Sequence, residues 1–269
     1  MSSPASLSFS YLKRTLQFRF EAGTSRGVMR TRDVFLIKVC RQGDLEQVGW
    51  GEAAPLAGLS PDFGPDFETL LSGILQEANA RTWDLEEESV LQQVKNLVPF
   101  SLPSLRFGLE TALLDLANGG KKRILANLFF DQGTPIPING LIWMGTKHFM
   151  LDQIQRRLEE GFGTLKMKVG AISWADELAL LKGIRERFSS RDLTLRVDAN
   201  GAFSRSSIDP VLHELAALEV HSIEQPLPTT DRDGLSEVCA VSPVPVALDE
   251  SLIGMFSKAD KELLLDTVR

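Results

Sequence analysis

Hydrophobic and polar residues alternate along the first fifth of the chain in the way that is typical of β-strands. Leu7, Phe9 and Tyr11 recur at every second position, and a β-branched and aromatic run covers residues 34–39. Because successive side chains of a strand point to opposite faces, this pattern predicts an antiparallel meander over residues 7–54. A polar stretch that contains glycine and arginine, residues 23–32, is predicted to form a mobile loop.

The hydrophobic period changes to that of helices after a Pro- and Gly-rich loop at residues 55–65. Helices are predicted at residues 67–78 and 86–97. The strongest helix signal lies at residues 104–118, where apolar side chains share one face and two glycines end the run. Strands followed by helices indicate an α+β domain, which we assign to residues 1–130.

From residue 131 to residue 269, short apolar strands alternate with amphipathic helices. The predicted strands are residues 137–142, 164–169, 193–197, 220–223 and 244–248. This alternation indicates a parallel sheet covered by helices, and a repeat of about 25 to 30 residues fits a (β/α) barrel. A closed barrel of this kind has about eight strands. Five strands therefore imply either an open sheet or a truncated sequence, and we favour a barrel domain that is incomplete at its C-terminus.

Composition is that of a soluble globular protein, with 43% hydrophobic and 24% charged residues. A net charge of −7 argues against a partner that is a polyanion, either a nucleic acid or a membrane surface. Cys40 and Cys239 lie far apart in the chain, which favours a reducing compartment, and no apolar run reaches the length of a membrane helix. We therefore expect a cytoplasmic protein that binds a small molecule, while the oligomeric state is not indicated.

Two lysines, Lys166 and Lys168, lie on the predicted strand at residues 164–169. Residues two apart on a strand share a face, so their ammonium groups would lie side by side. Like charge and partial burial both favour the neutral amine, so the pKa of one lysine is expected to fall toward the range of a base. The alternative interpretation of the same pattern is a solvated strand face.

Three acidic residues follow consecutive predicted strands at the same point of each unit. Asp198, Glu224 and Asp249 are about 25 residues apart, and the C-terminal ends of parallel strands converge on one mouth of a barrel. Hard carboxylate oxygens suit an octahedral Mg²⁺ ion. Each residue alone could instead cap the next helix. Three carboxylates in register with two lysines beside them favour a magnesium site.

Four segments resemble the signature blocks of the enolase superfamily, muconate-lactonizing subgroup. They are residues 164–170, 196–201, 223–227 and 248–251. Residues 49–60 and 137–142 are similar to the o-succinylbenzoate synthase family in particular. The resemblance covers nearly the whole chain and implies an N-terminal α+β capping domain followed by a (β/α)₇β barrel of the TIM type.

The resemblance also implies roles for the site residues. Asp198, Glu224 and Asp249 would bind Mg²⁺, and Lys168 would be the general acid and base. Lys166 would lower the pKa of Lys168 and touch the substrate carboxylate. Arg196 and Asn200, which flank Asp198 at two residues on either side, would support these groups from behind on the same strand face. Another lysine, on the sixth barrel strand opposite Lys168, is expected beyond Arg269.

The implied reaction is a Mg²⁺-dependent syn-dehydration in menaquinone or phylloquinone biosynthesis. It converts 2-succinyl-6-hydroxy-2,4-cyclohexadiene-1-carboxylate to o-succinylbenzoate and makes the enzyme a carbon-oxygen lyase. Loops at residues 23–32 and 56–60 are expected to close over the substrate. The alternatives are an N-acylamino-acid racemase or dipeptide epimerase of the same superfamily, and a truncated remnant without catalytic activity.

Overall fold

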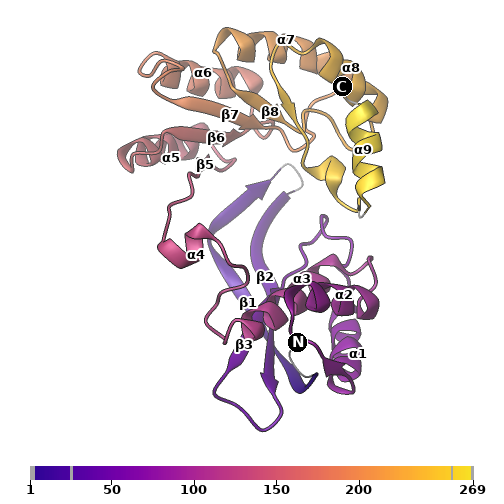
Figure 1. Ribbon diagram of the computed structural model, residues 1–269. Coiled ribbons are helices and arrows are strands. Elements are labelled where there is room, and N and C mark those ends of the chain that lie inside the picture. The colour runs from indigo at the N-terminus through magenta and orange to yellow at the C-terminus, as the bar shows by residue number, and fades with distance from the viewer. Residues whose placement is uncertain (1–3, 25–26, 256, 268–269) are drawn as a thin grey trace. The chain divides into compact units, whose positions relative to one another are not determined.

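The chain folds into two compact units. The structure, a computed structural model, describes residues 4–24, 27–255 and 257–267 (Figure 1). One unit comprises residues 1–18 and 31–136, and the other comprises residues 19–30 and 137–269. Within the described residues, no helix combines the length and the apolar character that crossing a membrane requires.

The β-rich unit is built on an antiparallel sheet whose strand order is β3-β2-β1-β4. Its strands are β1 (Ala5–Thr24), β2 (Gly27–Arg41), β3 (Val48–Ala53) and β4 (Thr82–Trp83). Leu7 and Phe9 are buried between more exposed neighbours, as the alternating pattern predicts. The predicted meander is confirmed, because β2 pairs with β3 from Phe35 opposite Ala53 to Cys40 opposite Val48.

The loop predicted at residues 23–32 is wrong for most of its length. β1 continues to Thr24 and β2 begins at Gly27, while residues 25–26 lie outside the described part of the chain. β1 and β2 are hydrogen-bonded neighbours in the sheet, so the described residues of this segment belong to paired strands and not to a loop.

Three helices pack on this sheet at the predicted positions. They are α1 (Phe67–Asn79), α2 (Glu87–Leu97) and α3 (Pro103–Ala117). The sequence pattern did not predict a short helix, α4 (Leu128–Gln132), which has no buried residue. Helix α3 lies unusually close to β3. A Cβ atom added at Gly51 would lie 1.9 Å from the Gly108 carbonyl oxygen, so only glycine permits this approach.

The second unit is a parallel sheet with the strands in sequence order, β5-β6-β7-β8-β9. The strands are β5 (Gly140–Ile142), β6 (Thr164–Lys168), β7 (Thr194–Asp198), β8 (Ser222–Glu224) and β9 (Val246–Ala247). The helices between and after them are α5 (Lys147–Glu159), α6 (Trp174–Arg185), α7 (Arg205–Ala217), α8 (Arg232–Val241), the 3₁₀ turn η1 (Glu250–Leu252) and α9 (Lys258–Thr267). The predicted alternation of strands and helices is confirmed, although β9 is shorter than the predicted residues 244–248.

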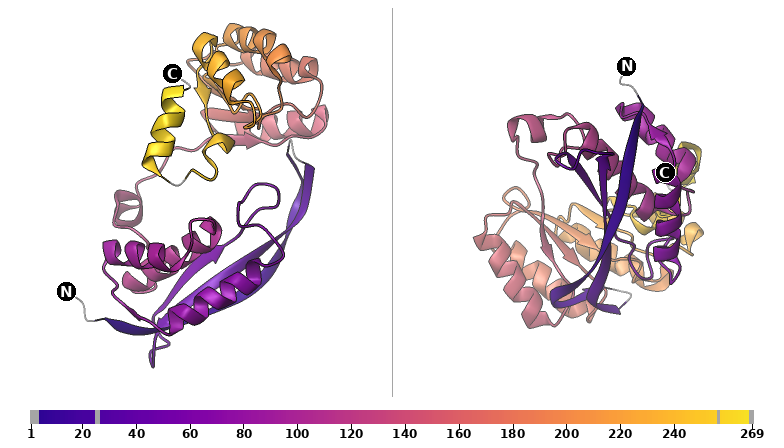
Figure 2. Two further views of the ribbon diagram at one scale, coloured as in Figure 1. Left: turned by 90° about the vertical axis from the view of Figure 1, so that its right-hand side faces the viewer. Right: turned by 90° about the horizontal axis from the view of Figure 1, so that it is seen from below.

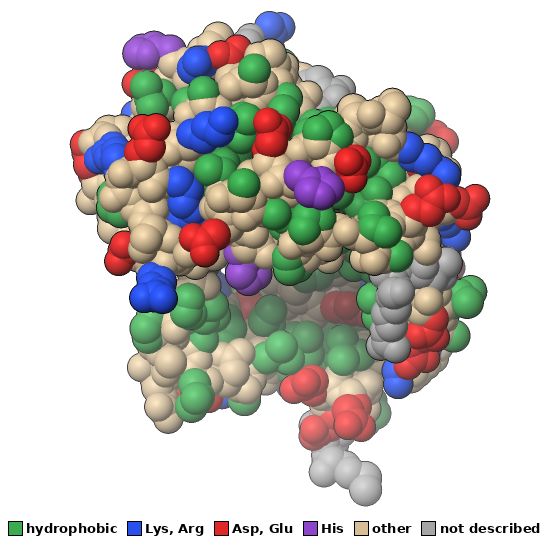
Figure 3. Space-filling model, turned by 90° about the horizontal axis from the view of Figure 1, so that it is seen from above, with side chains coloured by type: hydrophobic (Ala, Val, Ile, Leu, Met, Phe, Trp, Pro, Cys, Tyr) green, Lys and Arg blue, Asp and Glu red, His purple; other side chains and the backbone are tan. Residues whose placement is uncertain are grey.

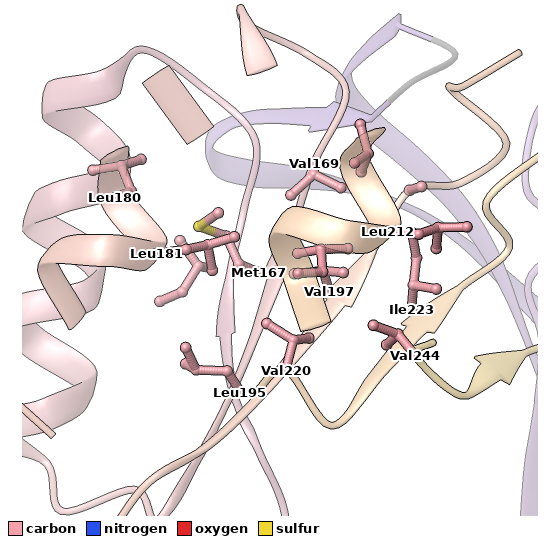
Figure 4. Packing of buried hydrophobic residues seen from close by; sticks show 14 of the residues in the cluster. Met167, Val169, Leu180, Leu181, Leu195, Val197, Leu212, Val220, Ile223 and Val244 are labelled. Carbon is pink, nitrogen blue, oxygen red and sulfur yellow. The ribbon is translucent and has the colours of Figure 1, made fainter. Parts of the chain in front are cut away.

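The two faces of this sheet differ in chemistry. Met167, Val197 and Ile223 point toward the helices, and Leu181 of α6 and Leu212 of α7 meet them in one buried cluster (Figure 4). Helices α5 to α8 lie along this side of the sheet (Figures 1 and 2), and on the outer surface drawn in Figure 3 acidic and basic side chains are interspersed. Strand alternation sends the residues between the buried ones to the opposite face, and these include Lys166, Lys168, Asp198 and Glu224.

Candidate active site

Strand register brings the predicted catalytic and acidic residues into one row at the C-terminal end of the sheet. Lys168 of β6 lies opposite Asp198 of β7, Asp198 lies opposite Glu224 of β8, and Glu224 lies opposite Ala247 of β9. Because paired residues of a parallel sheet point to the same face, these side chains converge. Three of the five residues that carry the predicted chemistry are thus neighbours in a single row.

Lys166 lies one step behind this row and reaches two carboxylates. Its Nζ is 2.7 Å from Glu224 Oε2 and 3.1 Å from Asp198 Oδ2, and the Asp198 side chain is only 2% exposed. Burial acts to lower the pKa of Lys166, but the hydrogen bond that Lys166 donates to Glu224 and the charge of Asp198 outweigh it, so the pKa is raised. The fall in pKa that was predicted for one lysine of the pair is therefore not found at Lys166, because the two carboxylates outweigh the effect of burial.

Lys168 is held by three different groups. Its Nζ donates a hydrogen bond to Asn200 Oδ1 at 2.8 Å and lies 3.5 Å from Asp198 Oδ2. The nitrogen also lies 5.7 Å from the centre of the Trp143 ring, within the range of a cation–π interaction. An amide oxygen accepts a hydrogen bond from a neutral amine as well as from an ammonium group. Asn200 can therefore hold the nitrogen in place while it gains or loses a proton.

Asn200 and Arg196, the predicted supporting residues, occupy different places. β7 ends at Asp198, and Asn200 has a left-handed φ of 45°, so the expectation that Asn200 shares the strand face is wrong. It reaches Lys168 from the loop, and its Nδ2 donates to Glu250 Oε1 at 3.0 Å. Arg196 lies in the row of Lys166, where its Nε donates to Ser222 Oγ at 3.4 Å.

Asp249 follows β9 by two residues, one step beyond the row. Desolvation raises the pKa of its carboxyl group although the residue as a whole is exposed, and the charges of Glu250 and Asp198 raise the pKa further. Lys166 and Lys168 act in the opposite direction. Asp249 therefore lies within electrostatic reach of Asp198 and both lysines, in a cluster of carboxylates that a cation would stabilise.

The acidic residues suit a hard divalent cation by their chemistry. Among the residues that the structure describes, no group of three or more His, Cys, Asp and Glu side chains is arranged to hold a metal ion. The Lys166 ammonium lies between Asp198 and Glu224 instead. The donors themselves fit Mg²⁺, since Asp198, Glu224 and Asp249 offer oxygen ligands from three adjacent strand ends. A rotation of the Lys166 side chain would leave these oxygens to the ion.

Three further residues in this region carry no role in the sequence-based prediction. Trp143 follows β5, and Gln153 of α5 brackets its backbone, accepting from Trp143 N at 2.9 Å and donating to Trp143 O at 3.0 Å. Glu177 of α6 is fully buried and accepts hydrogen bonds from the loop after β6. Gln225 is fully buried beside Glu224. Trp143 and Gln225 each come directly after a strand, and this position offered a signal. Glu177 lies on a helix and acts through loop backbone, so the sequence offered no such signal for it.

Comparison with known proteins agrees with this geometry. Residues 150–261 match the family model described as "Enolase C-terminal domain-like". An o-succinylbenzoate synthase from Desulfotalea psychrophila is 38% identical over 98% of this chain and 76% of its own length. The crystal structure of MenC from Desulfotalea psychrophila LSv54 aligns with a TM-score of 0.81 and 33% identity, over 98% of this chain and 76% of that chain.

Two more relatives bear on the chemistry. The o-succinylbenzoate synthase structure from Thermosynechococcus elongatus BP-1, complexed with Mg in the active site, aligns with a TM-score of 0.71 and 26% identity, over 96% of this chain and 72% of that chain. An L-Ala-D/L-Glu epimerase from Bacillus subtilis is 26% identical over 78% of this chain and 57% of its own length. Synthases and epimerases thus share this scaffold.

The β-rich first unit, the parallel second unit and its row of lysines and carboxylates define a member of the enolase superfamily. The match to the Desulfotalea psychrophila synthase, at 38% identity over 98% of this chain, narrows the assignment from the superfamily to one family. Within the superfamily, the chain belongs to the o-succinylbenzoate synthase family.

Proposed function

We propose that this chain catalyses the dehydration of 2-succinyl-6-hydroxy-2,4-cyclohexadiene-1-carboxylate to o-succinylbenzoate, which makes it a carbon-oxygen lyase. The observation that carries the proposal is the placement of Lys168. Its amine lies beside Asp198 and Asn200 at the end of a strand row that contains two carboxylates. A relative named o-succinylbenzoate synthase, which is 38% identical over 98% of this chain, supports the choice of reaction.

The chemical difficulty is the weak acidity of a proton that lies next to a carboxylate. Asp198, Glu224 and Asp249 would hold Mg²⁺, and the bound ion would supply electrostatic stabilisation of the negative charge that develops on the substrate carboxylate. Lys166 then leaves the carboxylates that it now contacts. Its ammonium becomes available to the substrate carboxylate, as the resemblance to the family implies.

Lys168 would carry the proton through both halves of the reaction. As a neutral amine it removes the α-proton, and the electron pair of the C–H bond moves toward the carboxylate. Its ammonium then returns the proton to the departing hydroxyl on the same face, the C–O bond breaks, and water leaves. The ring becomes aromatic, which provides the driving force. Asn200 Oδ1 would hold the nitrogen in both protonation states.

The finer assignments follow from the same resemblance. The five parallel strands would be part of a (β/α)₇β barrel, the arrangement in which strand ends gather around one mouth. The product would enter menaquinone or phylloquinone biosynthesis, and the protein would act in the cytoplasm. Arg196 would support the strand row from behind through Ser222.

Replacing the Lys168 amine tests the proposal. We expect Lys168→Ala to reduce dehydration by at least about a thousandfold, because the proton carrier is lost, while Mg²⁺ binding measured by calorimetry is retained. Lys258→Ala is the matched control, since this lysine is exposed and pairs with Glu262 on the surface. Turnover of the cyclohexadiene substrate by Lys168→Ala at the wild-type rate would remove Lys168 from the role.

Racemisation or epimerisation is the second candidate, because an epimerase matches over most of the chain. The same base could remove the α-proton of an N-succinylamino acid or a dipeptide. Assays of both substrate classes with one preparation separate the two functions. A chain that exchanges the α-proton of the amino acid derivatives but does not dehydrate the cyclohexadiene would be a racemase or epimerase.

A further inference from the structure

Gln225 occupies the position between two proposed metal ligands. It follows Glu224 directly, it is fully buried, and its backbone has a left-handed φ of 41°. A residue with a side chain rarely adopts this conformation, because Cβ then approaches backbone atoms. Such a conformation persists where surrounding contacts determine it, so the interactions of Gln225 are informative.

The side chain of Gln225 binds the loop that carries Asp249. Oε1 accepts hydrogen bonds from the backbone N–H groups of Asp249, at 3.3 Å, and Ser251, at 3.0 Å. Nε2 donates to Ser251 Oγ at 2.8 Å and to the Leu227 carbonyl oxygen at 3.0 Å. One amide thus uses both of its ends, and one of its bonds goes directly to the residue that bears a proposed ligand.

The backbone of Gln225 joins the same loop to the other two. Its N–H donates to the Ala247 carbonyl at 2.9 Å, and its own carbonyl accepts from Gly201 N at 2.7 Å. Next to it, Ala199 N donates to the Glu224 carbonyl at 2.9 Å. The loop after β7, which follows Asp198, the loop after β8, which follows Glu224, and the loop after β9, which carries Asp249, are therefore joined at Gln225.

We infer that Gln225 is a positioning residue that fixes the separation of Asp198, Glu224 and Asp249, and thereby sets the affinity of the site for a divalent cation. The inference rests on the proposed function only in taking these three carboxylates as the ligands. A buried amide suits this task because it has both donors and acceptors but brings no charge that would compete with the ion.

The test replaces Gln225 by methionine, which has a similar length but makes none of these hydrogen bonds. Mn²⁺ is the probe, and its binding is followed by electron paramagnetic resonance, which needs no turnover. We expect Gln225→Met to weaken Mn²⁺ binding by about 10- to 100-fold. Ser251→Ala, which removes one of the four side-chain bonds, is expected to weaken it several-fold, and this variant carries the test if Gln225→Met does not fold.

Gln93→Met is the matched control. Gln93 lies in the first unit, where its amide likewise brackets a backbone, donating to the Asp84 carbonyl at 2.8 Å and accepting from Asp84 N at 3.2 Å. It should lose stability in a similar way without a change in Mn²⁺ affinity. A purely structural role of Gln225 would give the two methionine variants the same Mn²⁺ affinity, and this result would overturn the inference.

The outcome for the inference is separate from the outcome for the proposed reaction. A wild-type chain that binds Mn²⁺ but does not dehydrate the cyclohexadiene refutes the proposed reaction. Weaker Mn²⁺ binding by Gln225→Met than by the wild type would still support the positioning role. A wild-type chain that binds no Mn²⁺ overturns both. Restoration of Gln225→Met activity by saturating Mg²⁺ would further support a role in affinity rather than in the chemical step.

Discussion

Lys166 compensates the negative charge of two carboxylates in the site. Its ammonium contacts the Asp198 and Glu224 carboxylates, which are among the least exposed charged groups of the second unit. Removing one partner of a buried pair is costly, because the remaining charge is left without compensation. The same carboxylates are the proposed ligands of Mg²⁺, so the lysine and the ion offer them the same kind of stabilisation.

This reasoning predicts the effect of Lys166→Met. The variant should lose roughly 3 kcal/mol of unfolding free energy in the presence of a chelator, because Asp198 and Glu224 lose a partner. Mg²⁺ should then stabilise the variant more than it stabilises the wild type. Urea unfolding with and without Mg²⁺ measures both effects.

Lys147→Met provides the comparison for Lys166→Met. Lys147 pairs with Asp176 at 2.8 Å, the same type of contact, but both side chains are about half exposed. Solvent screens such a pair, so this variant should change little. Equal losses in the two variants would show that burial of the Lys166 contacts contributes nothing.

At the scale of single residues, the sequence was sufficient to place side chains whose position follows from strand period and spacing. Lys168, Asp198 and Glu224 share one row because strand period and unit length determine where they fall. Gln225 and Asn200 could not be given their contacts in this way, since both have left-handed backbones that redirect the side chain after the strand ends. Contacts with the neighbouring loops decide whether the backbone becomes left-handed after a strand ends, and local sequence does not show these contacts.

Among the elements, β6 and α6 are joined by a loop that a single carboxylate organises. Glu177 accepts hydrogen bonds from Gly170 N at 2.8 Å and Ala171 N at 3.2 Å, just after Lys168 in the chain. Burial raises the pKa of Glu177, and the hydrogen bonds from the loop only partly oppose it. The strand that carries the proposed base is thus followed by a turn with a buried titrating group at its centre.

The raised pKa predicts how stability changes with pH. The stabilisation that comes from protonated Glu177 is fully present below its ordinary pKa of 4.5, where folded and unfolded chains both hold the proton. It is lost as pH rises through the folded-state pKa, because the unfolded chain releases its proton first. Glu177→Gln has no such titration. Unfolding free energies from about pH 4 to about pH 8 should therefore fall in the wild type relative to the variant; parallel curves would contradict the prediction.

Sequence patterns predicted elements best where burial is one-sided. Helices α1, α2 and α3 begin within a residue or so of the predicted positions, since an apolar stripe specifies which face is buried. The pattern did not predict that β1 continues to Thr24 and that β2 begins at Gly27, because strand pairing decides this and local composition does not. The short β9 differs from its prediction for a related reason, because its extent depends on its pairing with β8.

At the scale of the whole molecule, the proposed metal ligands are confined to one of the two compact units. The proposed ligands all belong to the unit that contains residues 137–269, while the close contact of β3 and α3 belongs to the other. A ligand stabilises only the state that binds it. Ion binding should therefore have its direct effect on one unit.

Hydrogen exchange can test this expectation. With Mg²⁺ we expect slower amide exchange in the segments around Asp198, Glu224 and Asp249, because the ion ties their loops together. Amides of β3 and α3 should exchange at the same rate with Mg²⁺ and with a chelator. Uniform slowing in both units would contradict a local effect, and no slowing around the three carboxylates would argue against the metal site.

The strand register also limits how this scaffold can diverge. Lys166 and Lys168 alternate with Leu165 and Met167, which are buried against the helices. One residue inserted in β6 before Lys166 would turn both lysines toward the core and send Met167 to the face that bears the carboxylates. Insertions in the turns leave the strand faces unchanged, so relatives that act on other carboxylic acids can differ in turn length. Within a short strand, the gain or loss of one residue would move the functional side chains to the wrong face.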